Sequence, residues 1–340
     1  MEQEAIFGDM LSMAQATKRC GGLVIVQVKR LARRGTLPAK NVKIPAMLVD
    51  LVVVDAQQAV TYQSPNDPAF TGEFRIPLND FPLLPLDERK IVVRRFAMEL
   101  LPGAVCNVGS GICTGIGLVS AEEDVLDSIV FTNGKGLSAA PLPPGWMPAP
   151  CAITARWWTS PISLIFTMAA GLISPFFPRP KSTPAAESIS AASPTNSSAS
   201  AVLSTSVKTP KKWYSAAHLP PAACTGGQLH IEQEGAHRKF VAALQQISYS
   251  GPYAASGVRR CCSSPSAPCS AWSTAHWTPG IDLERDVLQQ MAFRPRIAAD
   301  LKSMDARLFL PQPMGLHEEM AAKTRARHPR LAQLAPQVPL

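Results

Sequence analysis

The chain has 340 residues, of which 46% are hydrophobic and 17% are charged, and its formal net charge is +8. This length is sufficient for two folded cores. The positive charge at first suggests nucleic-acid binding, but +6 of it comes from residues 134–224, which hold seven basic residues and one acidic residue. The remaining charge is nearly balanced, so we expect no nucleic-acid partner.

The first predicted elements are a strand and a helix. Residues 48–54, LVDLVVV, predict a buried strand. Residues 87–101 predict an amphipathic helix packed on a sheet, because apolar residues recur at i, i+4 and i+8 with charged residues between them. The apolar residues are Val92, Phe96 and Leu100, and the charged ones are Arg89, Arg94, Arg95 and Glu99. Pro102 and Gly103 would end this helix.

A glycine-rich loop follows between two apolar runs. Residues 104–108 have the length of a strand, residues 118–126 have helical character, and residues 128–131 predict the next strand. The glycines between them are Gly109, Gly111, Gly115 and Gly117. Their spacing lets backbone N–H groups approach an anion or a polarised carbonyl without side-chain obstruction. The unit has the β-α-β pattern of an α/β protein. A tight turn in a parallel sheet, without any ligand, explains the glycines as well as a binding loop does.

Regular patterns are sparser in the second half of the chain. Residues 228–232 and 247–250 predict strands, and residues 284–293 predict a helix. About a third of the chain has no pattern that would bury a core. We therefore expect the sheet to lack its central strands after Phe131, and the chain to fold poorly.

Four stretches, in order along the chain, resemble the family I CoA-transferases, specifically the fused acetate or 3-ketoacid type. The first, GGLVIVQVKR at 21–30 with GTL at 35–37 and VKIP at 42–45, is similar to the end of the family's α-like half. The second, NDPAFTGE at 66–73, is similar to the linker between the halves. The third, PLDERKI at 85–91 with the glycine loop, is similar to the start of the β-like half. The fourth resembles the end of that half and comprises PGIDLERDVL at 279–288, MDAR at 304–307 and PMGL at 313–316.

The resemblance implies a specific chemistry. In this family a glutamate attacks an acyl-CoA thioester, an acyl-glutamyl anhydride and then a glutamyl-CoA thioester form, and CoA passes to a second carboxylic acid. Loop amides stabilise the oxyanions. By this resemblance, the residues of the CoA and oxyanion loop are Asn107, Gly109, Gly111 and Gly115. The loop departs from the family pattern at Ser110, Cys113 and Thr114.

The nucleophile of the family is missing from the expected place. It follows the strand after the glycine loop, in a Thr-Val-Glu-Pro-Gly context, whereas here Thr132 is followed by Asn133 and Gly134. An amide cannot form the glutamyl thioester. We therefore expect no intact catalytic residue in this chain.

Two anomalous segments accompany this loss. Residues 134–224 are crowded with Pro, Ser and Ala and hold a single acidic residue, Glu187, and residues 258–278 hold none. A shifted reading frame would explain both. With permissible codons, WTSPISLIFTMAAGL at 158–172 becomes DQPDQFDFYDGGGL, which is similar to a family signature. In the same frame, the segment 262–272 becomes LFITERAVFSL, which is again family-like. The chain is thus interpreted as an N-terminally truncated, frameshifted CoA-transferase.

This interpretation predicts an incomplete open α/β CoA-transferase fold with a disordered or misfolded Pro/Ser/Ala-rich middle. Residues 1–84 would be the end of the α-like half with the linker, and residues 85–132 the start of the β-like half. The β-like half would resume at 225–257 and end, with a tail, at 279–340. The segment 133–224 would be out of frame, and 258–278 would be the second anomalous segment.

Two other interpretations of the middle segment stay open. Its composition between 179 and 221 is also that of a disordered linker. The apolar run at 157–177 could be a membrane span, but Pro161 and Pro175 interrupt it and no signal peptide accompanies it, so we expect no genuine span. An interaction or membrane-attached protein built on residues 134–224 is the alternative function.

The remaining residues add no further site. The eight cysteines form no CxxC pair and the histidines have no ligand spacing, so no metal site is expected. Cys106 and Cys113 are expected to be buried or loop thiols rather than a disulfide. The basic pairs 29–30, 33–34 and 94–95 are expected to be solvated surface. The resemblance implies CoA as a substrate without a cofactor, acyl-CoA and a short-chain carboxylic acid as partners, a homo-oligomer and a cytoplasmic location.

Overall fold

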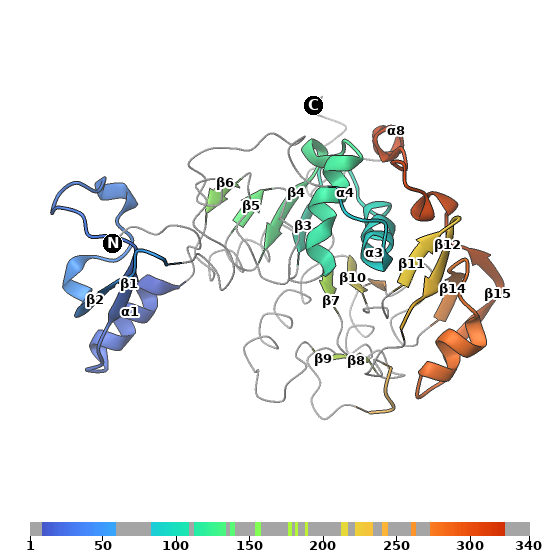
Figure 1. The fold of residues 1–340 in the computed structure, drawn as a ribbon, viewed down its shortest axis with the longest axis horizontal. Coiled ribbons are helices and arrows are strands. Elements are labelled where there is room, and N and C mark those ends of the chain that lie inside the picture. The colour runs from blue at the N-terminus through green and yellow to red at the C-terminus, as the bar shows by residue number, and fades with distance from the viewer. Residues whose placement is uncertain are drawn as a thin grey trace, which may run out of the picture.

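The computed structural model describes residues 9–58, 83–108, 112–133, 222–233, 240–243 and 277–323, together with the backbone of several short strands elsewhere in the chain. Figure 1 shows these residues as an N-terminal lobe, residues 9–58, at one end of the molecule and a larger body that contains the main sheet.

The main sheet has seven strands within the described residues, in the order β13-β10-β7-β3-β4-β5-β6. Their bounds are β3 Val105–Val108, β4 Val130–Asn133, β5 Leu137–Ala139, β6 Thr154–Trp157, β7 Phe176–Pro178, β10 Lys212–Ala216 and β13 Arg260–Cys262. β3 pairs in parallel with both β4 and β7, and β10 is parallel to β7 and β13. Only β5 runs antiparallel to its two described neighbours. The predicted open α/β sheet is thus confirmed.

The predicted strand-loop-helix-strand unit lies at the centre of this sheet. β3 and β4 are joined by two short 3-10 turns and a helix: η4 Ile112–Gly115, α4 Ile116–Glu122 and η5 Leu126–Ser128. β3 and β4 are in parallel register, with Cys106 opposite Phe131. The unit buries apolar residues from both strands and from α4, including Cys106, Ile116, Val119 and Phe131. Burial of these residues on both faces is typical of a parallel sheet.

The expectation that the sheet lacks strands after Phe131 is wrong for the described backbone. β5, β6, β7 and β10 all come from the segment expected to be out of frame, and β7 lies beside β3. The sequences of β7 and β10, FFP and KWYSA, contain aromatic residues that favour strands. Short strands can therefore form there whatever the origin of the segment, most of which lies outside the described residues.

A single helix, α3 Glu88–Ala97, forms where residues 87–101 predict one. Asp87 is its N-cap, and its side chain accepts a hydrogen bond from the Lys90 backbone N–H. The helix ends at Ala97, before the predicted stop at Pro102-Gly103, because the chain turns at Met98 and tightens into i to i+3 hydrogen bonds. Phe96 and Leu100 are buried as predicted.

α3 lies between α4 and the later elements of the body (Figure 1). These elements are the antiparallel hairpin β11 Ala222–Thr225 with β12 Gln228–Ile231, the turn η8 Ala306–Phe309 and the helix α8 Leu316–Ala322. Residues from all of them join one hydrophobic core, including Ala222, Leu229, Leu308 and Leu316. β12 confirms the strand predicted at 228–232.

The elements between this hairpin and η8 are less regular than predicted. The helix expected at 284–293 is replaced by two short turns, Leu283–Val287 and Leu288–Gln290. Only Leu288 is buried in them, so little apolar contact holds a longer helix in place. A parallel pair of strands lies next to them, formed by β14 Ser273–Trp277 and β15 Arg296–Ser303. Earlier in the chain, a separate antiparallel pair is formed by β8 Lys181–Ser182 and β9 Ser188–Ile189. The strand predicted at 247–250 lies outside the described residues.

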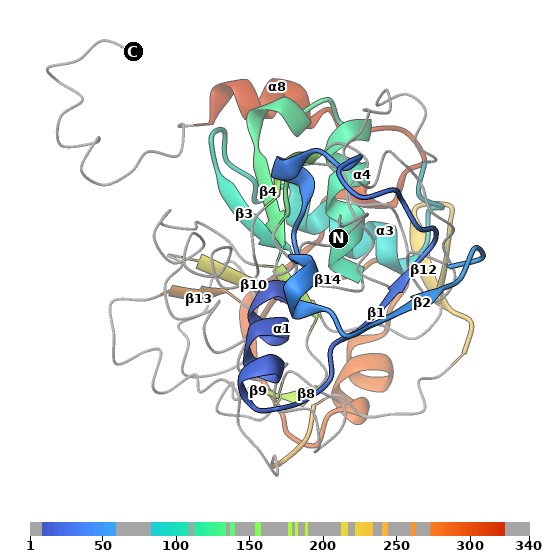
Figure 2. The same cartoon turned by 90° about the vertical axis from the view of Figure 1, so that its left-hand side faces the viewer.

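The N-terminal lobe consists of a helix, two 3-10 turns and two parallel strands (Figure 2). Their bounds are α1 Met10–Arg19, β1 Ile25–Val28, η1 Ala39–Asn41, η2 Ala46–Leu48 and β2 Leu51–Val54. The strand predicted at 48–54 is present only as β2, and the prediction that it is buried is wrong: its four residues are 48–51% exposed. β2 has one neighbouring strand among the described residues, and its side chains are about half exposed on both faces.

Candidate functional site

The carboxyl ends of β3 and β4 lie side by side in the middle of the main sheet. The chain runs from β3 to β4, β5 and β6 on one side, and then continues with β7 on the other side of β3. The strand order therefore reverses between β3 and β7. Ligands of open α/β sheets bind outside the carboxyl ends of the strands at such a reversal. The predicted glycine loop starts at this point.

A hydrogen bond between Asn107 and Thr132 joins the two strand ends. The Thr132 hydroxyl donates to Asn107 Oδ1 over 3.2 Å, and both residues are buried. The two residues are opposite one another in the parallel ladder, so the bond runs directly across it. Each of the two strands thus carries one uncharged polar side chain, one residue before its last residue. Both side chains lie next to the expected position of the nucleophile.

Of the predicted loop glycines, Gly109 and Gly111 lie outside the described residues. Gly115 is described, and its φ of −62° is one that any residue adopts. A Cβ at Gly115 would be 3.0 Å from Leu84 Cδ1 and 3.3 Å from Val93 Cγ2. The glycine is therefore explained by the close packing of η4 against Leu84 and against Val93 of α3. A role for Gly115 in oxyanion binding stays a prediction.

The described sequence next to this pair holds no carboxylate. Residues 112–115, which precede α4, and the last residue of β4 are all non-acidic. That last residue is Asn133, whose backbone pairs in register with Val108. The next acidic residues along the chain from the loop, Glu122 and Glu123, are at the far end of α4, where both make structural contacts.

Two cysteines of the unit are buried thiols. Cys106 and Cys113 are free and fully buried, which agrees with the prediction that they form no disulfide. Burial raises the pKa of each thiol from 9.0 to about 12. Since the thiolate is the reactive form, these residues are not available as replacement nucleophiles.

We expect this burial to be measurable by alkylation. In the native chain at pH 8, iodoacetamide should modify the exposed Cys20 while Cys106 and Cys113 stay unmodified, as read by mass spectrometry of peptides. A pKa of about 12 leaves about a thousandfold less thiolate than a pKa of 9.0. In urea all three should react at similar rates. Equal labelling of Cys106 and Cys20 in the native chain would contradict the burial.

A buried ion cluster near α3 was missed by sequence reasoning. The Arg94 guanidinium is fully buried and donates to Glu122 Oε1 over 3.0 Å, and Lys90 Nζ lies 2.8 Å from Glu122 Oε2. Arg94 also donates to the backbone carbonyls of Leu308, Leu310 and Gln312. The prediction that the pair 94–95 is solvated is therefore wrong for Arg94.

One local signal could have indicated this burial. Val93, Ala97 and Leu100 have helical spacing too, and Lys90 and Arg94 lie on the same face as that stripe. All five residues are buried. The pairs 29–30 and 33–34 do lie at the surface, with Lys29 half-buried and the other three residues exposed.

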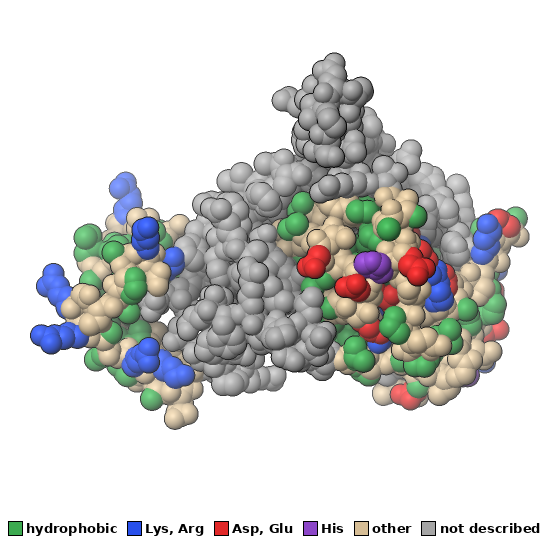
Figure 3. Space-filling view, turned by 90° about the horizontal axis from the view of Figure 1, so that it is seen from above, with side chains coloured by type: hydrophobic (Ala, Val, Ile, Leu, Met, Phe, Trp, Pro, Cys, Tyr) green, Lys and Arg blue, Asp and Glu red, His purple; other side chains and the backbone are tan. Residues whose placement is uncertain are grey.

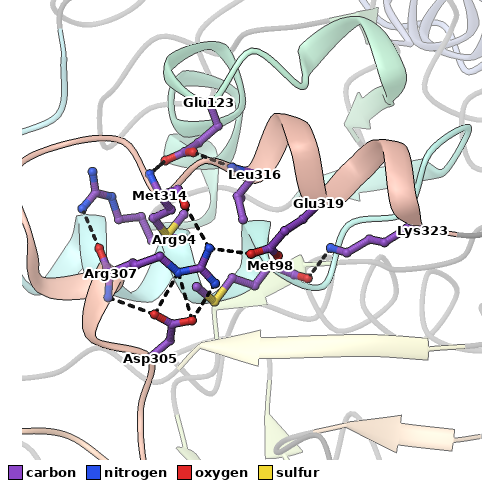
Figure 4. Close-up of polar contacts among 9 residues, drawn as sticks. All are labelled: Arg94, Met98, Glu123, Asp305, Arg307, Met314, Leu316, Glu319 and Lys323. Atoms are coloured by element: carbon purple, nitrogen blue, oxygen red, sulfur yellow. Dashed lines mark hydrogen bonds and ion pairs between the residues drawn. The ribbon is translucent and has the colours of Figure 1, made fainter.

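Further polar contacts fasten the C-terminal segment, residues 305–323, to α3 and α4 (Figure 4). Glu123 accepts hydrogen bonds from the backbone N–H groups of Met314 at 2.7 Å and Leu316 at 3.1 Å. Lys323 donates to the carbonyls of Met98 and Leu100 beyond the end of α3. Within the segment, Arg307 pairs with Asp305 and Glu319. The segment thus contributes to the same hydrophobic core as β3, β4 and α4.

The described residues hold no cluster of three or more potential metal ligands. None of their helices is both long and apolar enough to cross a bilayer. The apolar run at 157–177 lies almost entirely outside the described residues.

The fold with this central unit is that of the CoA-transferases. No family model matches the chain. Its solved relatives include the acyl-CoA transferase YdiF of Escherichia coli O157:H7, with a TM-score of 0.73 and 30% identity over 92% of this chain and 61% of that one. A thioester complex of the same enzyme with CoA gives a TM-score of 0.72. Glutaconate CoA-transferase of Acidaminococcus fermentans, at 14% identity and a TM-score of 0.50, shares the fold.

Curated sequences agree with the solved structures. The chain is 32% identical to caffeate CoA-transferase of Acetobacterium woodii, over 93% of this chain and 63% of that protein. It is 32% identical to acetate CoA-transferase YdiF of Escherichia coli K12, over 92% of this chain and 61% of that protein. The chain is therefore similar in sequence to acetate and caffeate CoA-transferases, and it spans less than two thirds of their length.

Proposed function

We propose that this chain descends from an enzyme that moves CoA between a short-chain acyl-CoA and acetate or acetoacetate, and that the chain itself is catalytically silent. One observation carries the proposal: the β3-loop-α4-β4 unit lies at the reversal of strand order, and Asn133 stands where the family resemblance places the nucleophilic glutamate. The homology to CoA-transferases supports the ancestry.

The chemistry explains why a single residue matters. A glutamate carboxylate would attack the acyl-CoA carbonyl, the CoA thiolate would leave, and an acyl-glutamyl anhydride would form. The thiolate would then attack the glutamyl carbonyl and release the acyl group as a carboxylate. A neutral amide at Asn133 lacks the anionic oxygen for the first step, and the buried thiols Cys106 and Cys113 do not supply a substitute.

We further propose a shifted reading frame in residues 133–224 and 258–278 as the cause of the loss. It supplies one origin for the missing carboxylate, the scarcity of acids and the family-like sequences in the neighbouring frame. The ancestral enzyme would be a cytoplasmic homo-oligomer that uses CoA as a substrate, binds it through Asn107 and the loop glycines, and needs no cofactor.

Mass spectrometry tests the catalytic part. We expect the purified chain, incubated with acetyl-CoA, to show no mass increase of one CoA and no exchange of label between acetyl-CoA and free acetate, while E. coli YdiF is the positive control. A gene with the frame restored across both segments, joined to the part of YdiF that this chain lacks, should give both signals. A hydroxylamine-sensitive CoA adduct on the unaltered chain would disprove silence. Resequencing the coding DNA across codons 130–280 tests the frame separately.

A further inference from the structure

The N-terminal lobe carries a dense group of basic residues. Residues 29–43, which we call the basic strip, hold six cationic side chains and no acidic one. The six are Lys29, Arg30, Arg33, Arg34, Lys40 and Lys43, and all except the first and the last are exposed. Figure 3 shows basic side chains that project from this lobe, at the left of the view.

The cations of the basic strip have no carboxylate partners within the described residues. The described lobe has three acidic residues, Asp9, Asp50 and Asp55. Asp50 pairs with Lys18 at 2.6 Å, outside the strip, and Asp55 accepts a hydrogen bond from Gln27. The ion pairs found in this part of the chain include none of Lys29, Arg30, Arg33, Arg34 and Lys40. Charge of one sign that is concentrated in this way attracts an anionic partner.

The backbone of the basic strip is held in place by the lobe. Val26 before the strip and Ile44 after it are both buried in the core of the lobe, which fixes the two ends. Between them, Thr36 donates from its backbone N–H and from its hydroxyl to the Arg33 carbonyl, so residues 33–36 form a closed turn. The cations therefore project from an ordered loop, and binding costs less conformational entropy than it would for a flexible tail.

Exposed leucines lie between these cations. Leu31 is 72% exposed and Leu37 is 36% exposed. Exposed aliphatic side chains next to Lys and Arg are typical of segments that bind the boundary between the headgroups and the acyl chains of a bilayer. A nucleic acid would offer phosphates to the cations but no apolar contact to the leucines, and residues 9–58 contain no aromatic residue on which bases could stack. The composition of the strip thus favours a lipid surface.

We propose that the basic strip docks this chain reversibly on a bilayer surface rich in anionic phospholipid. The cations lie among the lipid phosphates, and Leu31 enters the acyl boundary. Clusters of about four to eight Lys and Arg residues are typical of such attachment, which needs no membrane-spanning helix. The inference goes beyond the proposed function, and it does not depend on whether the chain is catalytically silent.

Vesicle flotation tests the proposal, because lipid-bound chain floats in a density gradient whereas aggregated chain does not. The full chain is titrated with vesicles of equal parts phosphatidylserine and phosphatidylcholine, and with vesicles of phosphatidylcholine alone. We expect binding to the first kind only, and its loss when the salt concentration is raised from about 0.1 M to about 1 M. Arg33→Gln combined with Arg34→Gln should weaken binding roughly 25-fold, since each cation near an anionic surface contributes about fivefold.

Matched controls separate the strip from the charge and the exposed leucines of the rest of the chain. Arg89→Gln combined with Arg294→Gln removes the same charge from the body, at side chains that are 52% and 68% exposed, and should leave binding unchanged. Leu31→Ser should weaken binding about tenfold and keep its salt dependence. Leu83→Ser, at a leucine that is 71% exposed outside the lobe, should have no effect.

Three results would overturn the proposal. The first is the absence of binding to the anionic vesicles. The second is binding that the substitutions in the strip weaken no more than their controls do, which would place the attachment elsewhere in the chain. The third is tighter binding to a DNA oligonucleotide than to the vesicles, which would assign the strip to nucleic acid. Circular dichroism melts check that the variants are folded, and the CoA-adduct assay is read separately because docking does not need catalysis.

Discussion

Replacement of Arg94 by Met should lower the free energy of unfolding by about 3–5 kcal/mol, the range for breaking a buried ion pair from one side. The substitution leaves the buried Glu122 carboxylate with Lys90 as its remaining cationic partner. It also removes the donor from the carbonyls of Leu308, Leu310 and Gln312. Urea unfolding followed by circular dichroism measures the change.

The neighbouring arginine is the matched control for Arg94. Arg95 pairs with Glu99 four residues later at 2.9 Å, and both side chains are partly exposed. Arg95→Met makes the same chemical change at a position where ion pairs contribute about 0.2–1 kcal/mol. If the two variants lose the same stability, the buried cluster has no special role. Arg94→Lys should rescue little, because an ammonium cannot reach the carboxylate and three carbonyls together.

Replacement of Glu123 by Ala should lower the free energy of unfolding by about 2–4 kcal/mol, since a hydrogen bond to a charged group contributes about 1.5–3 kcal/mol. Glu123 is 3% exposed, and its carboxylate accepts from two buried backbone N–H groups, those of Met314 and Leu316. Without it, both donors stay buried and unpaired at the start of α8. Hydrogen exchange of the Leu316 amide should accelerate in parallel with the loss of stability.

Glu318 provides the comparison for Glu123. It lies in the first turn of α8, is exposed, and carries the same charge. Glu318→Ala should change the free energy of unfolding by less than about 1 kcal/mol, through the helix dipole alone. An equal loss in the two variants would mean that the charge, and not the pair of buried hydrogen bonds, stabilises the segment.

Local sequence patterns predicted the centre of the fold well. The strands at 104–108 and 228–232 are found, and so are the strand predicted at 128–131 and the helix predicted at 118–126, with their bounds shifted to 130–133 and 116–122. Each of these elements is indicated by a periodicity of apolar residues that lies entirely within one short segment of the sequence. The end of α3 and the irregular turns at 283–290 were not predicted, because the point where a helix ends depends on contacts that its last residues make with other segments.

Contacts between distant segments explain the other misses. The burial of Arg94 depends on carbonyls more than 200 positions later, which no window on α3 can contain. The exposure of β2 depends on the absence of a described neighbour, which its apolar sequence cannot reveal. At the candidate site the loop and Asn133 were recognised by resemblance, whereas the Asn107–Thr132 pair needed the register of two strands.

The Arg94 cluster also has a consequence during protein synthesis. The guanidinium bonds a carbonyl 216 residues downstream, so its site stays incomplete until Leu310 has left the ribosome. At about 5–20 residues per second, this takes roughly 10–45 s. Throughout that interval Arg94 can pair with Glu122 but lacks its late carbonyl acceptors, and the part of α3 that packs against η8 is uncovered. The nascent chain should therefore be a chaperone substrate until translation is nearly finished.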